Sequence, residues 1–113
     1  MLSEDQLRQE IADFSRLTYQ KGYLASTDGN LSVRLSDREI MCTPTMINKG
    51  FVRPEDLAVV DLAGKRVRGD QKASSEIAMH TLIYEMRPDV NAVVHCHPPA
   101  ATAYAAAGIP LNK

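Results

Sequence analysis

The sequence predicts a mixed α/β fold, a sandwich built around a largely antiparallel sheet. Helix signals occur at three places along the chain, and short apolar or alternating segments that are typical of strands lie between them. Two of these segments are separated by a short turn, which favours antiparallel pairing. The chain has 113 residues, a size that fits one domain with a hydrophobic core of its own.

Composition and charge narrow the class of protein. Apolar residues make up 44% of the chain and charged residues 24%, values that are ordinary for a globular domain and argue against disorder. The 13 Lys and Arg against 14 Asp and Glu give a net charge of −1. A nucleic-acid binder that neutralises phosphates is therefore not expected, and neither is a membrane protein, because no apolar stretch is long enough to span a bilayer.

The cellular location is inferred from the N-terminus and the cysteines. The first ten residues are polar and carry three acidic side chains, unlike a signal peptide. Cys42 and Cys96 are too few for a disulfide scaffold, so we expect reduced thiols in a cytoplasmic protein. Nothing near either cysteine indicates a reactive thiol, and both are expected to be small core residues.

The first helix and a hairpin are predicted from the N-terminal third. Ser3 and Gln6 have the spacing of a capping box at the start of a helix, and Gly22 is suited to end it. A stripe of apolar residues at helical spacing is expected to face the core: Leu7, Ile11, Phe14 and Leu17. Residues 30–35 then alternate in polarity and residues 39–42 form a second short run, so the two predict a hairpin.

The middle of the chain is expected to hold a loop and two more strands. Residues 43–55 contain two prolines and a glycine and are interpreted as a long loop. Residues 57–62 form a nearly continuous apolar run, which predicts a buried strand. A turn at Gly64 then leads to a polar edge strand over residues 65–68.

The last third predicts helix, strand and helix. Ser74 or Ser75 is expected to cap the second helix, which Pro88 ends. The face that this helix buries is predicted from apolar spacing: Ile77, Met79, His80, Ile83, Tyr84 and Met86. Residues 92–95 predict a short β-branched strand. A third helix is expected to start at Pro98 and Pro99, which suit a first helical turn, and to end at Gly108.

His95 and His97 carry the sharpest local chemical signal. Side chains of a strand repeat every second residue on one face, so the two imidazoles point the same way while Cys96 points away. Neutral imidazole is a common ligand of zinc and its neighbours in the divalent series. The pair predicts a metal site, with two polar residues at a solvent-facing strand end as the alternative. A catalytic zinc normally has three protein ligands, so a third is expected elsewhere.

Glu76 and His80 lie four residues apart and share one face of the second helix. His80 could point at the ion or be a hydrogen-bonded core residue, and we favour the structural role. Glu76 begins the helix after two serines, where free N–H groups favour negative charge. Spacing alone leaves open whether Glu76 is reactive or caps the helix.

Three polar turns are ambiguous when taken singly. Residues 26–30 combine hydroxyl side chains, a glycine and an asparagine, and such a turn can present N–H groups to an anion or be a plain turn. Residues 43–45, and likewise Ser74 and Ser75, could also form either an anion-binding turn or a plain turn.

Taken together, these segments resemble the class II aldolase and adducin family. The resemblance rests on five stretches in the family's order and spacing: Thr27-Asp28-Gly29-Asn30-Leu31-Ser32-Val33-Arg34, Thr43-Pro44-Thr45, Lys49-Gly50, Ser74-Ser75-Glu76 with His80, and Arg87-Pro88-Asp89 followed by Val93-Val94-His95-Cys96-His97-Pro98-Pro99. It covers the chain from the first helix to about Gly108. Family members are about twice as long, so residues 1–113 are expected to be one domain that is truncated at its C-terminal side.

The resemblance implies a three-layer α/β/α fold and a homotetrameric enzyme that depends on a divalent metal ion, usually Zn²⁺. It assigns the metal to His95 and His97, with the third histidine in the missing half, and it makes Glu76 the catalytic acid/base. Substrate-binding positions are implied by motif: Thr27, Gly29, Asn30, Thr45, Ser74 and Ser75.

The activity that the resemblance implies is carbon–carbon cleavage of a small sugar phosphate or hydroxy-carbonyl compound through a metal-stabilised enediolate. An epimerase or dehydratase with the same chemistry, or a non-catalytic adducin-like module, is the alternative. Aldolase members usually have glycine after the position of Thr45, where this chain has Met46, so both phosphorylated and unphosphorylated substrates stay open.

Overall fold

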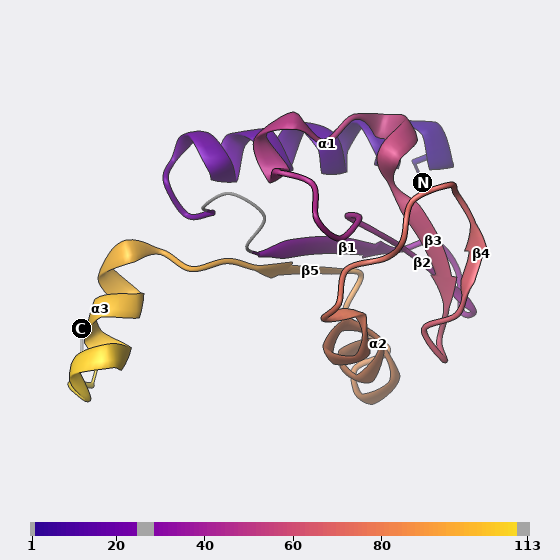
Figure 1. Ribbon diagram of the computed structural model, residues 1–113. Coiled ribbons are helices and arrows are strands. Elements are labelled where there is room, and N and C mark those ends of the chain that lie inside the picture. The colour runs from indigo at the N-terminus through magenta and orange to yellow at the C-terminus, as the bar shows by residue number, and fades with distance from the viewer. Residues whose placement is uncertain (1, 25–28, 111–113) are drawn as a thin grey trace.

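A five-stranded antiparallel sheet forms the middle of the molecule (Figure 1). The computed structural model describes residues 2–24 and 29–110. The strands have the spatial order β4-β3-β2-β1-β5, and every neighbouring pair is antiparallel. Their bounds are β1 (Asn30–Arg34), β2 (Glu39–Cys42), β3 (Ala58–Asp61), β4 (Arg66–Arg68) and β5 (Ala92–His95). The predicted hairpin, buried strand and edge strand are confirmed.

Helices cover both faces of the sheet, which confirms the three-layer arrangement. α1 (Glu4–Gln20) lies on one face and α2 (Ile77–Met86) on the other (Figure 1). α3 (Pro99–Ala107) follows β5 and lies beyond the end of the sheet. Within the part of the chain that the structure describes, no helix has the length and apolar character needed to cross a membrane.

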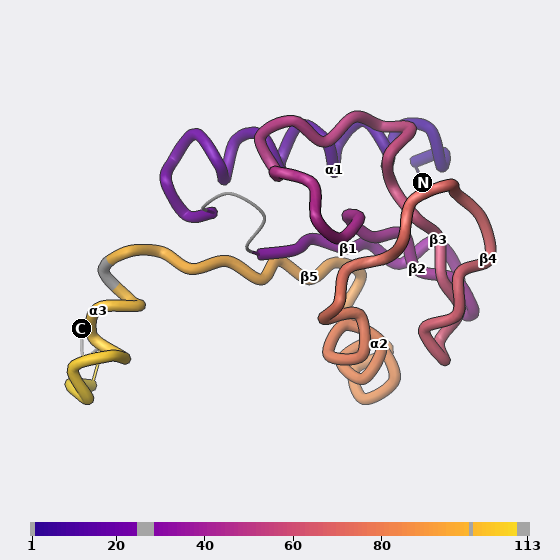
Figure 2. Tube along the Cα trace, viewed as in Figure 1, coloured from indigo at the N-terminus to yellow at the C-terminus, as the bar shows by residue number. Residues whose placement is uncertain are grey.

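The long segment between β2 and β3 runs on the α1 side of the sheet (Figure 2). It contains two short 3-10 helices, η1 (Lys49–Phe51) and η2 (Pro54–Asp56), which pack against α1. The predicted loop therefore has local structure, because its backbone groups are paired in these turns.

The capping box of α1 forms as predicted. The Ser3 hydroxyl accepts from the Gln6 N–H at 3.2 Å, and the Gln6 side chain accepts from the Ser3 N–H at 2.8 Å. Gly22 follows Lys21, the C-cap of the helix, and its φ of +78° is the left-handed conformation that glycine adopts without steric cost.

The apolar stripe of α1 is only partly buried, so this prediction was partly wrong. Ile11 is buried and Leu7 half-buried, but Phe14 and Leu17 are exposed, with 54% and 42% of their surface accessible. The C-terminal end of α1 reaches beyond the sheet (Figure 1). Periodicity shows which face of a helix is apolar but not how far the partner layer extends.

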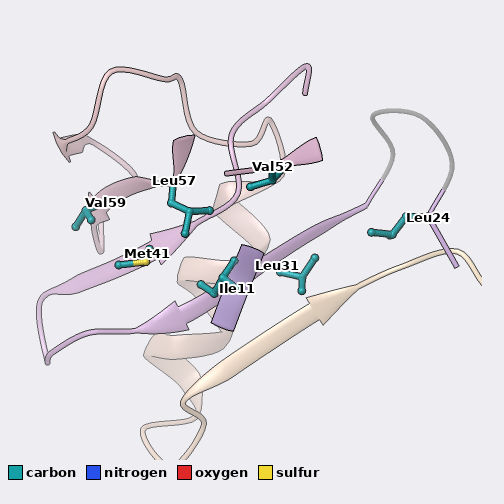
Figure 3. Close-up of a cluster of buried hydrophobic side chains, with 7 residues drawn as sticks. All are labelled: Ile11, Leu24, Leu31, Met41, Val52, Leu57 and Val59. Atoms are coloured by element: carbon teal, nitrogen blue, oxygen red, sulfur yellow. The ribbon is translucent and has the colours of Figure 1, made fainter. Parts of the chain in front are cut away.

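Two cores lie on opposite faces of the sheet because strand side chains alternate. On the α1 side, Ile11 lies next to Leu31 in a cluster completed by residues from β2, β3 and the loops (Figure 3). On the α2 side, Tyr84 packs with buried residues of the two central strands: Ile40, Cys42, Ala58 and Val60. Burial raises the pKa of the Cys42 thiol to about 12, which agrees with a core role and not with reactivity.

The buried face of α2 differs from the predicted one. His80, Thr81 and Tyr84 are buried, whereas Met79 and Met86 are 36% and 72% exposed. Neither serine is the N-cap: Glu76 holds that position, and the Ser74 hydroxyl accepts from the Glu76 N–H in the turn before the helix. The helix thus begins two residues later than a cap at Ser74 implies and one residue later than a cap at Ser75 implies.

Candidate metal and substrate site

His95 and His97 converge at the end of β5. Their ring centroids lie 4.9 Å apart, with the ring planes at 51°. Cys96 packs against the core on the α1 side, so the alternation expected from a strand is present. His95 is half-buried and His97 is exposed. Both imidazoles therefore face the α2 side of the sheet.

Glu76 reaches the same place from the start of α2. Its Oε2 lies 3.1 Å from Nδ1 of His95. The side chain makes no capping hydrogen bond with the helix, although Glu76 is the N-cap residue, and it is about half exposed. The capping interpretation of this carboxylate is therefore not supported, and the carboxylate is available to the site.

His95 also shows an unsatisfied polar atom. Its Nδ1 is buried and has no hydrogen-bond partner in the described ranges. The contact with Glu76 is an ion-pair distance, but its angle does not meet that of a hydrogen bond. A buried polar nitrogen without a partner is costly, and the cost is removed when the ring binds a cation or turns to pair with Glu76.

The residues present fit a divalent cation in part. Two imidazoles and an adjacent carboxylate form a donor set that zinc and related ions accept. Over residues 2–24 and 29–110, however, no three His, Cys, Asp or Glu side chains are placed to hold one ion together. The structure thus places His95, His97 and Glu76 near one another without completing a three-ligand site.

His80 is a hydrogen-bonded core residue, as favoured from the sequence. It is 1% exposed, and its ring bonds to the side chains of Ser32 and Asn30 on β1. Burial, together with the charge of the nearby His95, lowers the pKa of His80 to about 4, although Glu76 acts in the opposite direction. The ring is therefore neutral at physiological pH.

A hollow of about 240 Å³ opens beside these groups. It is lined by residues from five separate stretches of the chain: Gly29, Asn30, Thr45, Lys49, Ser74, Ser75, Glu76 and His97. The structure therefore brings together the predicted site residues that it describes; His95 joins them through Glu76. Thr27 lies outside the described residues.

Backbone pairing accounts for the meeting of Thr45 with Ser74. The Thr45 N–H donates to the Lys72 carbonyl at 2.9 Å, and the Ser74 N–H donates to the Thr43 carbonyl at 3.2 Å. Pro44 and Ala73 form an isolated antiparallel bridge between these bonds. Two turns that looked ambiguous separately thus form one wall of the hollow.

Gly29 is required where β1 meets the end of β5. Its φ is +83°, and a Cβ at this position would lie 2.9 Å from the His95 carbonyl oxygen and overlap the Leu24 side chain. Only glycine allows this approach. The backbone at Gly29 is therefore packed directly against His95, a predicted metal ligand.

Lys49 is the lining residue that sequence reasoning missed. It is 1% exposed, and its Nζ donates to the Ile47 carbonyl at 3.0 Å. A lysine in a loop is normally a surface residue, so only its place in the Lys49-Gly50 motif could have drawn attention to it. The structure therefore adds a buried lysine to the residues that line the hollow.

A second, broader hollow of about 680 Å³ adjoins the first. Both are lined by Thr45, Ser74 and Ser75, and the second adds two cationic side chains, Arg66 and Lys72. The hydroxyl-rich wall thus lies between Glu76 on one side and positive charge on the other. This distribution suits a small molecule that carries an anionic group at one end.

Residues 9–113 match the family model described as Class II Aldolase and Adducin N-terminal domain. A methylthioribulose-1-phosphate dehydratase of Pseudomonas syringae pv. tomato is 41% identical over 101 residues, which cover 89% of this chain and 50% of the relative. An L-fuculose phosphate aldolase of Methanococcus vannielii is 41% identical over 96 residues, 85% of this chain and 51% of that one.

Solved structures give the same result. YgbL of Klebsiella pneumoniae, a putative aldolase/epimerase/decarboxylase, superposes with a TM-score of 0.87 and 34% identity, covering 93% of this chain and 50% of that chain. An L-fuculose 1-phosphate aldolase superposes with a TM-score of 0.86 and 32% identity, covering 98% and 52%. The chain thus spans about half the length of the relatives it matches.

Proposed function

The chain belongs to the class II aldolase and adducin N-terminal domain family, and from this premise we propose that it contributes to the active site of a metal-dependent lyase acting on a small sugar phosphate. The observation that carries the proposal is the meeting of Glu76, His95 and His97 at the rim of a hydroxyl-lined hollow. A structural role alone does not require these three groups to meet.

The metal ligands that this chain would supply are His95 and His97. A divalent cation there, most simply Zn²⁺, supplies Lewis-acid polarisation of a substrate carbonyl. The orphaned Nδ1 of His95 supports this assignment. A catalytic zinc normally has three protein ligands, so we propose that a third comes from outside the described residues.

Glu76 is the proposed acid/base. Its carboxylate is exposed enough to meet a substrate and makes no competing capping bond. A carboxylate beside a polarised carbonyl can take or return a proton at the neighbouring carbon. In aldol cleavage it would return the proton to the carbon freed when the carbon–carbon bond breaks.

The anionic group of the substrate is assigned to the wall formed by Asn30, Thr45, Ser74 and Ser75, with Gly29 shaping the loop and Thr27 as a further proposed contact. Hydroxyl and amide donors suit phosphate oxygens, and Lys49 lines the same hollow. The position of Met46 leaves these donors in place, because its side chain is 78% exposed.

Dehydration is the second candidate, and the relatives favour it. Proteins named methylthioribulose-1-phosphate dehydratase match this chain at up to 41% identity. In dehydration Glu76 would take the proton next to the carbonyl, and the hydroxyl group on the following carbon would leave as water. Cleavage and dehydration therefore share the base and the carbonyl site and differ in the bond that breaks.

The test compares wild-type full-length protein with Glu76→Gln, using Glu85→Gln as a control on the exposed face of the same helix. Metal content and turnover of a panel of ketose phosphates are measured, with products scored for cleavage, epimerisation and dehydration. We expect all three proteins to hold metal, and Glu76→Gln to lose about 10²–10⁴-fold in rate while Glu85→Gln is unchanged.

An unchanged rate in Glu76→Gln removes this residue from the chemistry. Stoichiometric zinc in a wild-type protein that transforms no member of the panel favours instead the non-catalytic, adducin-like module. Assembly as a homotetramer and a cytoplasmic location stay predictions.

A further inference from the structure

Four side chains form a continuous chain of hydrogen bonds from the buried core to the hollow. The Tyr84 and Ser32 hydroxyl oxygens lie 2.8 Å apart, and the Ser32 oxygen lies 2.5 Å from Nδ1 of His80. Nε2 of His80 then bonds to Oδ1 of Asn30. Asn30 and Ser32 share one face of β1, and His80 and Tyr84 are one turn apart on α2, so regular geometry alone aligns the four groups.

The direction of donation is fixed by where each hydrogen can go. In the described part of the chain, Ser32 is the acceptor within reach of the Tyr84 hydroxyl, because the second contact of this hydroxyl is with the backbone N–H of Val93, which is a donor. If Ser32 donated to Tyr84, the hydrogen of this buried phenol would have no acceptor, which is costly. Tyr84 therefore donates to Ser32, and Ser32 donates its single hydrogen to Nδ1 of His80.

The tautomer of His80 follows from this direction. Nδ1 accepts, so the proton of the neutral ring is on Nε2, and Nε2–H donates to Oδ1 of Asn30. The ring stays neutral because it is buried, which holds its pKa at about 4. A protonated ring would have two donors and could not accept from Ser32.

The orientation of the Asn30 amide is the consequence at the site. Its oxygen is occupied by His80, and its side chain makes no second hydrogen bond with the residues that the structure describes. Asn30 lines the hollow that Thr45, Ser74 and Ser75 also line. With the oxygen turned toward α2, the NH₂ group is left to donate to a ligand in the hollow.

We propose that His80 is a positioning residue that fixes the Asn30 amide with its NH₂ group, and not its oxygen, toward a bound phosphate. The proposal rests on the assignment of this hollow to the substrate anion in the proposed function. It adds a specificity rule: an anion that accepts hydrogen bonds is favoured here, and a group that must donate one is not.

Two substitutions of His80 separate its two hydrogen bonds. The amide nitrogen of glutamine can occupy the place of Nε2, so His80→Gln keeps a donor for Asn30. Asparagine is one methylene shorter and reaches only the place of Nδ1, so His80→Asn keeps a partner for Ser32 but removes the donor. A purely structural role predicts similar behaviour from the two, whereas positioning predicts that glutamine alone preserves function.

The readout is the binding of inorganic phosphate to the full-length protein by calorimetry. We expect His80→Asn to raise the Kd about tenfold, the cost of a misdirected or unsatisfied polar group, and His80→Gln to stay within about threefold of wild type. In an Asn30→Ala background the same His80→Asn change should alter the Kd less than about twofold, because the group that it positions is gone.

Equal loss in the two His80 variants, or the full effect in the Asn30→Ala background, overturns the proposal, as does a wild-type protein that binds no phosphate. Nitrogen-15 spectra of the wild-type imidazoles give a check that needs no variant: His80 should carry its proton on Nε2, and a proton on Nδ1 contradicts the assignment. Neither measurement needs turnover, so failure of the lyase function is detected separately.

Discussion

Met46 replaces the glycine that is usual after Thr45 in the family, yet the backbone at this position has a conformation that glycine favours. It has φ of +64° and is the non-glycine residue with positive φ among those described. A left-handed backbone costs a side chain about 1–2 kcal/mol and costs glycine little. The chain therefore keeps the conformation that the family's usual glycine favours, and the exposed Met46 side chain is directed away from the protein interior.

The buried His80 predicts a pH dependence of stability. Burial, with His95 nearby, lowers its pKa from 6.5 to about 4, so the unfolded state binds this proton more tightly. The stability from neutral His80 is complete above pH 6.5 and is lost as the pH falls toward 4. Between pH 7 and pH 4.5 we expect wild type to lose about 2–3 kcal/mol more unfolding free energy than His80→Gln.

Denaturant titrations of wild type and His80→Gln at several pH values measure this difference. The variant serves as the reference because it keeps every carboxylate that also titrates in this range. Parallel pH profiles for the two proteins would show that His80 is not held neutral by the fold.

Among the elements, α1 depends mainly on local sequence signals, whereas β5 depends on pairing with a distant strand. α1 has a complete capping box, acidic residues in its first turn and a glycine after its last turn. β5 is an edge strand of four residues whose neighbour is β1. His95 thus lies on a strand that tertiary pairing with β1 holds in place, opposite Asn30, and His97 follows this strand directly.

The capping box predicts a measurable loss in Ser3→Ala. The variant removes the acceptor for the Gln6 N–H and leaves the start of α1 without its side-chain cap, so we expect the unfolding free energy to fall by about 1 kcal/mol. Arg16→Ala, an exposed change within the same helix, is the control and should change stability by less than about 0.5 kcal/mol. Equal effects of the two changes would mean that the cap contributes nothing.

Over the whole molecule, the sheet separates two cores. One lies under α1 and the other under α2, and the candidate site lies on the α2 side at the end where β1 and β5 pair. The core that holds α2 in place therefore also sets the position of Glu76 relative to His95. A loss of packing on this face is therefore expected both to lower the stability of the fold and to change the geometry of the site.

Ile40 tests the packing on this face. It is fully buried in β2, and Ile40→Val removes one methylene from the cluster under α2. We expect the unfolding free energy to fall by about 0.5–1.5 kcal/mol. Val67→Ala on the exposed edge strand β4, where the side chain is 47% exposed, should change it by less than about 0.5 kcal/mol. Chemical denaturation of both variants measures these changes, and a larger loss of unfolding free energy in Val67→Ala than in Ile40→Val would contradict the prediction.

Local signals in the sequence were enough for the elements and for the candidate residues. The capping box, the hairpin turn, the glycine at position 108 and the alternation of His95, Cys96 and His97 each depend on neighbours a few residues apart, and the structure contains all of them. Chain order and motif resemblance also brought Glu76, Asn30, Thr45 and the two serines into one candidate site.

Only the tertiary structure decided which faces are covered and how the polar groups are paired. Phe14, Leu17, Met79 and Met86 have apolar spacing but are exposed among the residues that the structure describes. Lys49 is buried, which the local sequence does not indicate. The bonds from Tyr84 through Ser32 and His80 to Asn30 join residues up to 52 positions apart in the chain. Periodicity and capping are set by the nearest turns of the chain, whereas burial and the direction of a hydrogen-bond network depend on which distant segments meet.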